Sequence, residues 1–259
     1  TQSNPGVAKG LTSKAVDDEA FAIFGPVFSG SIMVSMAESR RAQVPNFIGG
    51  EAAAITKQGN PYVFRTSFTQ DTAMPKVARY IANTLKARTV ALIYVNNDYG
   101  KGVAEAFQKA FEAKGGAVTI SAAHEDGKAD YSSEVAALAA AGGELLVVAG
   151  YVDQGGKGVI QAAVDSGAFA TFYLPDGMFG QPLIDAVGAP MNGSYGDVPG
   201  NDSEGSAKYQ ELAKAAGFNG SNAFSGESYD AAALMALAMV AAKSTNSKDW
   251  AGKVMDLAN

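Results

Sequence analysis

The sequence predicts an α/β protein in which parallel β-sheets are wrapped by helices. Segments 90–95 and 145–149 are almost wholly apolar, which is typical of strands covered on both faces of a parallel sheet. Strand and helix patterns alternate along the 259 residues with short turns between them. A strand, a glycine-containing loop and a helix recur at 21–31, 92–102 and 145–155. With 259 residues, the chain is long enough for two domains of modest size.

The first of these junctions illustrates how each element is assigned. Residues 21–24 are apolar and predict a buried strand, which Gly25 and Pro26 end. Apolar residues at helical spacing then predict a helix over 32–41. The other expected strands are 44–48, 62–66, 90–95, 117–122, 145–149, 172–174 and 193–198. The other expected helices are 6–16, 74–86, 101–115, 131–141, 158–166, 207–216 and 221–242.

Bulk composition excludes several function classes. The net charge is −6, so the chain carries no electrostatic footprint for nucleic acid or an anionic membrane. The chain has no Cys, which excludes thiol nucleophiles, disulfides and Cys-zinc sites. The longest run without a polar residue or glycine, 231–242, is too short to span a bilayer.

No catalytic signature is present, so we expect no enzyme, no cofactor and no metal site. The glycine-rich stretch 150–158 lacks the spacing of a dinucleotide-binding loop and predicts a tight turn into a helix. The only histidine, His124, lies beside Glu125 and Asp126 in an expected polar loop, and we interpret it as a surface residue. No nucleophile elbow follows a strand.

Polar and aromatic residues gather instead at the carboxyl ends of the expected strands, where α/β proteins bind ligands. Each could also be a helix cap or turn residue, and for Asp98 and Asp153 we favour that simpler interpretation. Taken together, a Ser/Gly nest, one carboxylate and several aromatics suit a zwitterionic small molecule. The residues are Ser29, Gly30, Gly50, Glu51, Ala52, Asn97, Asp98, Tyr99, Tyr151, Asp153, Asp176 and Phe179.

These features resemble the type I periplasmic solute-binding proteins, in particular the branched-chain amino-acid receptors of ABC importers. The similarity runs over the whole chain in the same order, and six short motifs stand in register. They are residues 2–5 (QSNP), 24–26 (FGP) with Ser29, 62–66 (YVFRT), 97–102 (NDYGKG), Tyr131-Ser132 and 228–232 (SYDAA).

The resemblance implies two Rossmann-like lobes, each with a parallel central sheet and helices on both faces, that trap a ligand by hinge closure. Lobe 1 is expected to hold residues 1–69 and 199–259, and lobe 2 residues 70–198. By position, Ser29 resembles the serine that holds the ligand carboxylate, with help from Gly50 and Ala52. Tyr99 and Tyr151 resemble residues of the second lobe that close over the ligand, and Asp176 resembles the acid that binds the ammonium. The full set of expected ligand-binding residues is Phe28, Ser29, Gly30, Gly50, Ala52, Tyr99, Tyr151 and Asp176.

The chain departs from the family pattern in two respects. Ala52 stands where a hydroxyl often assists carboxylate binding, and we expect the neighbouring Glu51 to point away from the ligand. Family members are also longer, and the first strand, first helix and second strand of lobe 1 have no counterpart here. We therefore expect a fragment that lacks N- and C-terminal segments and exposes a sheet edge.

The resemblance implies an extracytoplasmic solute receptor that binds a small amino acid or related carboxylate and delivers it to the permease of an ABC importer. The expected protein is a monomer, periplasmic or extracellular, with a lipid anchor left open for the full-length form. The alternative is a ligand-sensing regulator or receptor ectodomain of the same fold, responsive to an amide or an aromatic acid. An acyl- or phosphoryl-transfer enzyme would need a nucleophile–base pair or a metal cluster, neither of which the sequence offers.

Overall fold

The computed structural model describes residues 1 and 4–258 and divides the chain into two compact units. Unit 1 comprises Thr1–Phe68 and Pro199–Asn259, and unit 2 comprises Thr69–Val198. The chain therefore passes from one unit to the other at 68–69 and at 198–199. Whether these units act as two lobes that close on a ligand stays a prediction. Gln2 and Ser3, part of the first motif of the resemblance, lie outside the described residues.

Unit 1 contains a parallel sheet with the order β1-β2-β3, in which Phe24, Phe47 and Phe64 occupy matching positions. Its strands are β1 (Ile23–Phe24), β2 (Asn46–Ile48) and β3 (Val63–Arg65). Its helices are α1 (Pro5–Asp17), α2 (Ser29–Ala42), α3 (Ala53–Lys57), α9 (Glu204–Ala215), α10 (Ser225–Ala242), α11 (Ser247–Trp250) and α12 (Lys253–Ala258).

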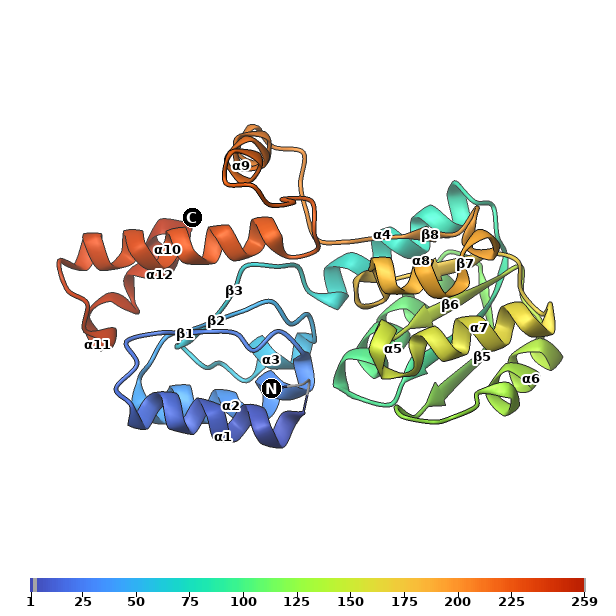
Figure 1. The fold of residues 1–259 in the computed structure, drawn as a ribbon, viewed down its shortest axis with the longest axis horizontal. Coiled ribbons are helices and arrows are strands. Elements are labelled where there is room, and N and C mark those ends of the chain that lie inside the picture. Colours follow the sequence, from blue (N-terminus) through green and yellow to red (C-terminus); the bar gives the residue numbers. More distant parts are fainter. Residues whose placement is uncertain (2–3, 259) are drawn as a thin grey trace. The chain divides into compact units, whose positions relative to one another are not determined.

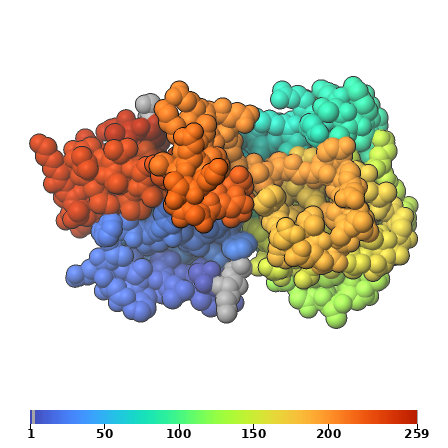
Figure 2. Space-filling view, turned by 45° about the horizontal axis from the view of Figure 1, so that its top comes forward, coloured from blue at the N-terminus to red at the C-terminus, as the bar shows by residue number. Residues whose placement is uncertain are grey.

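Unit 1 has a hydrophobic cluster on each face of its sheet, and one of the two joins its two sequence segments. Alternate residues of a strand point to opposite faces, so Ile48 packs with Ile32 and Met36 of α2, whereas Phe47 packs with Trp250. The second cluster also holds Ala231 and Ala238 of α10, which joins the early and late segments. Figure 1 shows α1 and α2 on one face of this sheet and α10 on the other, and Figure 2 shows the N- and C-terminal segments of the unit packed together.

The prediction of a buried first strand is wrong. β1 has only two residues, and Phe21 and Phe24 are 53% and 56% exposed. Among the residues that the structure describes, β1 pairs with β2 and has no strand on its other side. An edge strand is covered on fewer sides than a central one, so the phenyl ring of Phe24 reaches solvent.

Unit 2 contains a five-stranded parallel sheet with the order β5-β4-β6-β7-β8. The strands are β4 (Thr89–Val95), β5 (Ala117–His124), β6 (Leu145–Ala149), β7 (Phe172–Leu174) and β8 (Tyr195–Gly196). The α-helices are α4 (Gln70–Asn83), α5 (Asp98–Glu112), α6 (Ser132–Ala141), α7 (Lys157–Ser166) and α8 (Gln181–Val187). Three short helical turns complete the unit: η1 (Val152–Gly156), η2 (Asp176–Met178) and η3 (Ala189–Met191).

The central strands of unit 2 are buried on both faces, as their apolar sequences predict. All five residues of β6 are buried. On one face Ile93 and Val148 pack with Leu138 of α6 and Ile160 of α7. On the other face lies α5, whose Phe107 is fully buried. The fold is thus α/β with parallel sheets and covering helices, as predicted.

His124 corrects a second expectation. It is the last residue of β5 rather than part of a polar surface loop, and it is only 1% exposed. β5 alternates exposed and partly buried residues up to Ala123, as expected of a strand at the edge of the sheet. The hydrophobic pattern ends at residue 122, whereas the hydrogen bonding of β5 to β4 continues to the pair Val95–His124.

Candidate functional site

Three of the expected ligand-binding residues come together at the carboxyl ends of neighbouring strands of unit 2. Tyr99 follows β4, Tyr151 follows β6 and Asp176 follows β7. The carboxyl ends of parallel strands meet at one edge of a sheet, which places these three loops side by side. Tyr99 and Asp176 are 2% and 7% exposed, so both side chains are held inside the unit.

Tyr99 links the other two residues of this cluster. Its hydroxyl donates a hydrogen bond to Oδ1 of Asp176 at 2.7 Å, and the backbone N–H of Gly177 donates to the Tyr99 oxygen at 3.3 Å. The ring of Tyr99 stacks on that of Tyr151, with centroids 4.7 Å apart and planes inclined by 22°. The cluster therefore presents a carboxylate next to two stacked aromatic rings.

Two close approaches hold this arrangement together. A side chain at Gly177 would lie 2.3 Å from the carbonyl oxygen of Gly150 and 2.8 Å from the ring of Tyr151, so only glycine fits there. Behind Tyr99, the buried amide of Gln70 donates to the Tyr99 carbonyl at 2.9 Å. Gln70 is the first residue of α4, so the start of unit 2 helps to fix Tyr99.

Asp197 is a residue of this region that sequence reasoning missed. It directly follows β8, and its N–H donates to the carbonyl of Leu174, the last residue of β7, at 3.3 Å. Burial and then the negative charge of Asp176 raise the pKa of Asp197 to about 7, against a hydrogen bond from Tyr173 that lowers it. The expected strand 193–198 contains Asp197, whereas β8 ends at Gly196, so the overlong strand hid the position of Asp197 at a strand end.

The expected residues of unit 1 form a second cluster. The N–H of Ala52 donates to Oγ of Ser29 at 3.3 Å, and a side chain at Gly50 would lie 3.3 Å from the same oxygen. Ser29 is 1% exposed and is the first residue of α2, after Phe28 at the N-cap. Phe28 and Gly30 are half-buried beside it. A 14-residue helix with unpaired N–H groups at its start favours negative charge there.

Glu51 lies in the same loop and has an oppositely charged neighbour. It is 2% exposed, and its charge interacts with Arg65 of β3. The Arg65 guanidinium also donates to the Ala52 carbonyl at 2.8 Å, while burial lowers the pKa of Arg65. Arg65 thus fixes the loop that holds Gly50 and Ala52, a contact that the sequence pattern did not reveal. That Glu51 points away from a ligand stays a prediction.

Among the other loop residues, Asn97 rather than Asp98 caps the following helix. Asn97 caps α5 by accepting a hydrogen bond from the N–H of Gly100 at 3.0 Å, and Asp98 is exposed in the first turn of that helix. Asp153 is exposed in η1, and Phe179 is 54% exposed. These residues therefore stand apart from the two buried clusters.

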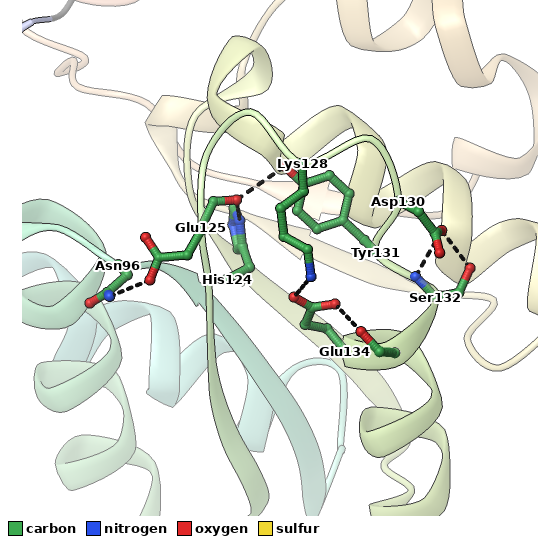
Figure 3. A network of polar contacts seen from close by, with 9 residues as sticks. Asn96, His124, Glu125, Lys128, Asp130, Tyr131, Ser132 and Glu134 are labelled. Carbon is green, nitrogen blue, oxygen red and sulfur yellow. Dashed lines mark hydrogen bonds and ion pairs between the residues drawn. The ribbon is translucent and has the colours of Figure 1, made fainter.

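A third polar network surrounds the buried His124 (Figure 3). Its Nδ1 lies 3.2 Å from the carbonyl oxygen of Glu125, and the Tyr131 hydroxyl donates to that same oxygen at 3.1 Å. Burial lowers the pKa of His124, partly offset by that backbone contact and by the charges of Glu134 and Asp126. Sequence reasoning assigned this network no role.

Two further properties of the described residues limit what else the units could hold. Across residues 1 and 4–258, no three acidic, histidine or cysteine side chains are grouped so as to hold a metal ion. In the same part of the chain, no helix combines the length and apolar character needed to cross a membrane.

Comparison with known proteins places these units in a family. A family model described as periplasmic binding protein matches residues 1–254. The leucine-, isoleucine-, valine-, threonine- and alanine-binding protein of Pseudomonas aeruginosa is 24% identical over 200 residues, which are 76% of this chain and 52% of that protein. The Leu/Ile/Val-binding protein homolog 1 of Brucella suis is 27% identical over 251 residues, which are 95% of this chain and 66% of that protein.

Solved structures agree on the fold. The leucine-binding protein LivK of Thermotoga maritima superposes with a TM-score of 0.88 at 20% identity, over 98% of this chain and 74% of that one. A solute-binding protein of an ABC transporter from Rhodopseudomonas palustris, in complex with p-hydroxybenzoic acid, gives a TM-score of 0.79 at 20% identity, over 98% and 70%. The chain spans about half the length of the first curated relatives, 52% and 50%. With its family model matched along almost the whole chain and its fold shared, this chain belongs to the periplasmic binding protein family.

Proposed function

We propose that the chain is the ligand-binding part of an extracytoplasmic solute receptor, which holds a small amino acid or related carboxylate between its two units and delivers it to an ABC importer. The observation that carries this proposal is the cluster of Tyr99, Tyr151 and Asp176, in which Tyr99 and Asp176 are buried. Relatives named for binding leucine, isoleucine and valine support the amino-acid class. The role is binding rather than catalysis, in keeping with a family of binding proteins.

The unit 2 cluster supplies the cation-binding end of the proposed site. A buried carboxylate is costly unless it is hydrogen-bonded or paired with a positive charge. Tyr99 provides one hydrogen bond to Asp176, and a ligand ammonium would provide a charged partner. The stacked rings of Tyr99 and Tyr151 would form an apolar wall for the ligand side chain.

The unit 1 cluster supplies the anion-binding end. Ser29 accepts from the Ala52 N–H, which leaves its own O–H to donate to a ligand carboxylate. The N–H groups at the start of α2, near Gly30, add favourable electrostatics. With Ala52 in place of a hydroxyl residue, the backbone N–H groups of this loop carry more of that contact. Phe28 would border the same end of the ligand.

Delivery would follow from closure. The two chain passages at 68–69 and 198–199 are the natural hinges, because only these segments join the units covalently. Closure around a ligand would present a surface made by both units to a membrane permease. We expect the receptor to act as a monomer on the outer side of the cytoplasmic membrane.

A ligand screen tests this function in the full-length protein. L-leucine, 4-methylpentanoate and 4-hydroxybenzoate are compared by thermal shift, since a ligand at about 100 times its Kd adds about 2.7 kcal/mol of stability. We expect L-leucine to raise the Tm and 4-methylpentanoate, which lacks the ammonium, to do so much less. Asp176→Asn should abolish the leucine shift, whereas Asp98→Asn, an exposed acid on α5, should keep it. A shift by 4-hydroxybenzoate alone would contradict the amino-acid class.

A further inference from the structure

His124, the last residue of β5, packs against residues 150–156, the loop that contains Tyr151. A side chain at Gly150 would lie 3.5 Å from Nε2 of His124, and one at Gly155 would lie 3.0 Å from its Nδ1. Gly155 has φ of +87°, a conformation that side chains rarely adopt. Residues 150–156 therefore rest on the imidazole through positions without side chains, and Tyr151 lies within this stretch.

Tyr131 completes the platform under the loop. Its ring meets the imidazole edge-on at 5.5 Å, and a side chain at Gly155 would lie 2.4 Å from its hydroxyl oxygen. A side chain at Gly158 would likewise lie 2.7 Å from the Tyr131 ring. Gly150 at the start of the loop and Gly155 near its end thus pack against the two buried rings of His124 and Tyr131, which Figure 3 shows side by side.

The contact with the Glu125 carbonyl determines which tautomer the neutral imidazole adopts. The carbonyl oxygen of Glu125 can only accept, so Nδ1 of His124 carries the proton. Within the described part of the chain, Nε2 is buried and has no hydrogen-bond partner. A proton on Nε2 would create a buried cation with an unsatisfied donor, which is costly. The loop must then move to give Nε2 access to water or an acceptor.

We propose that neutral His124 is a positioning residue for Tyr151, and that a proton on His124 loosens residues 150–156 and so weakens ligand binding. The effect on ligand binding rests on the proposed function, in which Tyr151 forms part of the apolar wall beside the ligand. A movement of residues 150–156 would shift Tyr151 and, through the stacked rings, Tyr99. Tyr99 in turn donates the hydrogen bond that positions Asp176.

Burial and the surrounding charges determine the pH at which His124 takes up a proton. Burial lowers the pKa of His124, and nearby carboxylates oppose this effect. Lys128 forms an ion pair with Glu134 and so reduces its influence, while burial raises the pKa of Tyr131, which keeps that ring neutral. The charged residues on the elements around the imidazole are Glu125, Asp126, Lys128, Glu134, Asp153 and Lys157.

Calorimetry with L-leucine between pH 8 and pH 5 tests the proposal. We expect the leucine affinity of the wild type to fall as the pH is lowered. The total fall is about tenfold for each pKa unit by which leucine binding lowers the pKa of His124. His124→Asn keeps an N–H donor near the Nδ1 position and cannot take up a proton, so its affinity should not follow this fall. In Asp197→Asn the acid beside Asp176, whose pKa is raised to about 7, no longer titrates, so the fall in affinity that remains in this variant belongs to His124. An unchanged pH profile in His124→Asn would overturn the proposal.

A second variant tests the contact itself. Gly155→Ala places a methyl group against Tyr131 and His124, so it should weaken leucine binding at every pH without removing the pH dependence. Wild-type affinity in this variant would show that the loop is not held by the platform and would contradict the proposal.

A ligand-free measurement separates this proposal from the proposed function. Amide hydrogen exchange of residues 150–158, corrected for intrinsic rates, should be faster at pH 5 than at pH 7.5 in the wild type but not in His124→Asn. Equal protection at both pH values in the wild type would refute the positioning role. If no amino acid binds, the proposed function fails, while this exchange result still decides the role of His124.

Discussion

The buried acids of the two units have opposite electrostatic neighbours. In unit 1 the charge of Glu51 meets the guanidinium of Arg65. In unit 2 Asp197 meets the like charge of Asp176, and its pKa is raised to about 7. The negative charge of a buried acid beside a base is neutralised within the protein, whereas the negative charge of two neighbouring acids favours the binding of a cation. The contrast supports an assignment in which unit 2 binds the ammonium of the ligand and unit 1 its carboxylate.

A phenylalanine in the core of unit 2 differs strongly in burial from one on the edge strand of unit 1. Phe107 of unit 2 is fully buried and stacks on Phe111 with centroids 5.4 Å apart, whereas Phe24 of unit 1 is 56% exposed. We expect Phe107→Ala to lower the free energy of unfolding by about 3–5 kcal/mol, because it leaves a cavity. Phe24→Ala should change it by no more than about 0.5 kcal/mol. Chemical denaturation measures both free energies of unfolding, and equal effects would contradict the difference in burial between these two residues.

The raised pKa of Asp197 gives stability a pH dependence. Since its folded pKa lies above the unfolded value of 3.8, the folded state holds the proton more tightly, and this stability is lost as pH rises from about 4 to about 7. The slope from this group is at most about 1.4 kcal/mol per pH unit. Asp197→Asn should therefore be more stable than the wild type at pH 8 and should lose that advantage at pH 4.

Glu51→Gln is the comparison in unit 1. It removes the negative charge next to Arg65 and should lower the free energy of unfolding at pH 8. Thermal unfolding at both pH values compares them, and stabilisation by both variants at pH 8 would remove the contrast.

The Tyr99 hydroxyl sharpens the comparison within unit 2. Tyr99→Phe removes the 2.7 Å hydrogen bond to Asp176 and keeps the stack on Tyr151. A hydrogen bond to a charged group contributes about 1.5–3 kcal/mol, so leucine affinity should fall by roughly tenfold to a hundredfold. Tyr195→Phe, on the edge strand β8, is the matched control and should bind normally. Calorimetry that finds equal affinities for the two variants would exclude a role for this hydroxyl.

Two neighbouring serines of α2 allow a smaller test in unit 1. Ser29→Ala removes the acceptor of the Ala52 N–H and should cost about 0.5–1.5 kcal/mol of leucine affinity. Ser31 is equally buried, but in the described chain its hydroxyl has no hydrogen-bond partner, so Ser31→Ala should be neutral or stabilising. A loss of affinity in Ser31→Ala that matches Ser29→Ala would point to general packing of the helix rather than to carboxylate binding.

Sequence patterns located most elements because the central strands are apolar and the helices amphipathic. The expected strand 145–149 is β6, and the expected strand 172–174 is β7. Boundaries moved where side chains do not decide them: α2 begins at Ser29 rather than at residue 32, and β5 continues to His124. The short helices α3, α8, α11 and α12 were not expected, because segments of four to seven residues carry little periodicity.

The sequence by itself determined the α/β class, the parallel strands and the loops where candidate ligand residues lie, because periodicity and composition are local properties. Only the tertiary structure decided which of those residues meet. The hydrogen bond between Tyr99 and Asp176 spans 77 positions of the chain, and the register of β7 with β8 places Asp197 near Asp176. It also decided that His124 is buried and that Phe24 is exposed, since burial depends on what packs against a residue rather than on its neighbours in sequence.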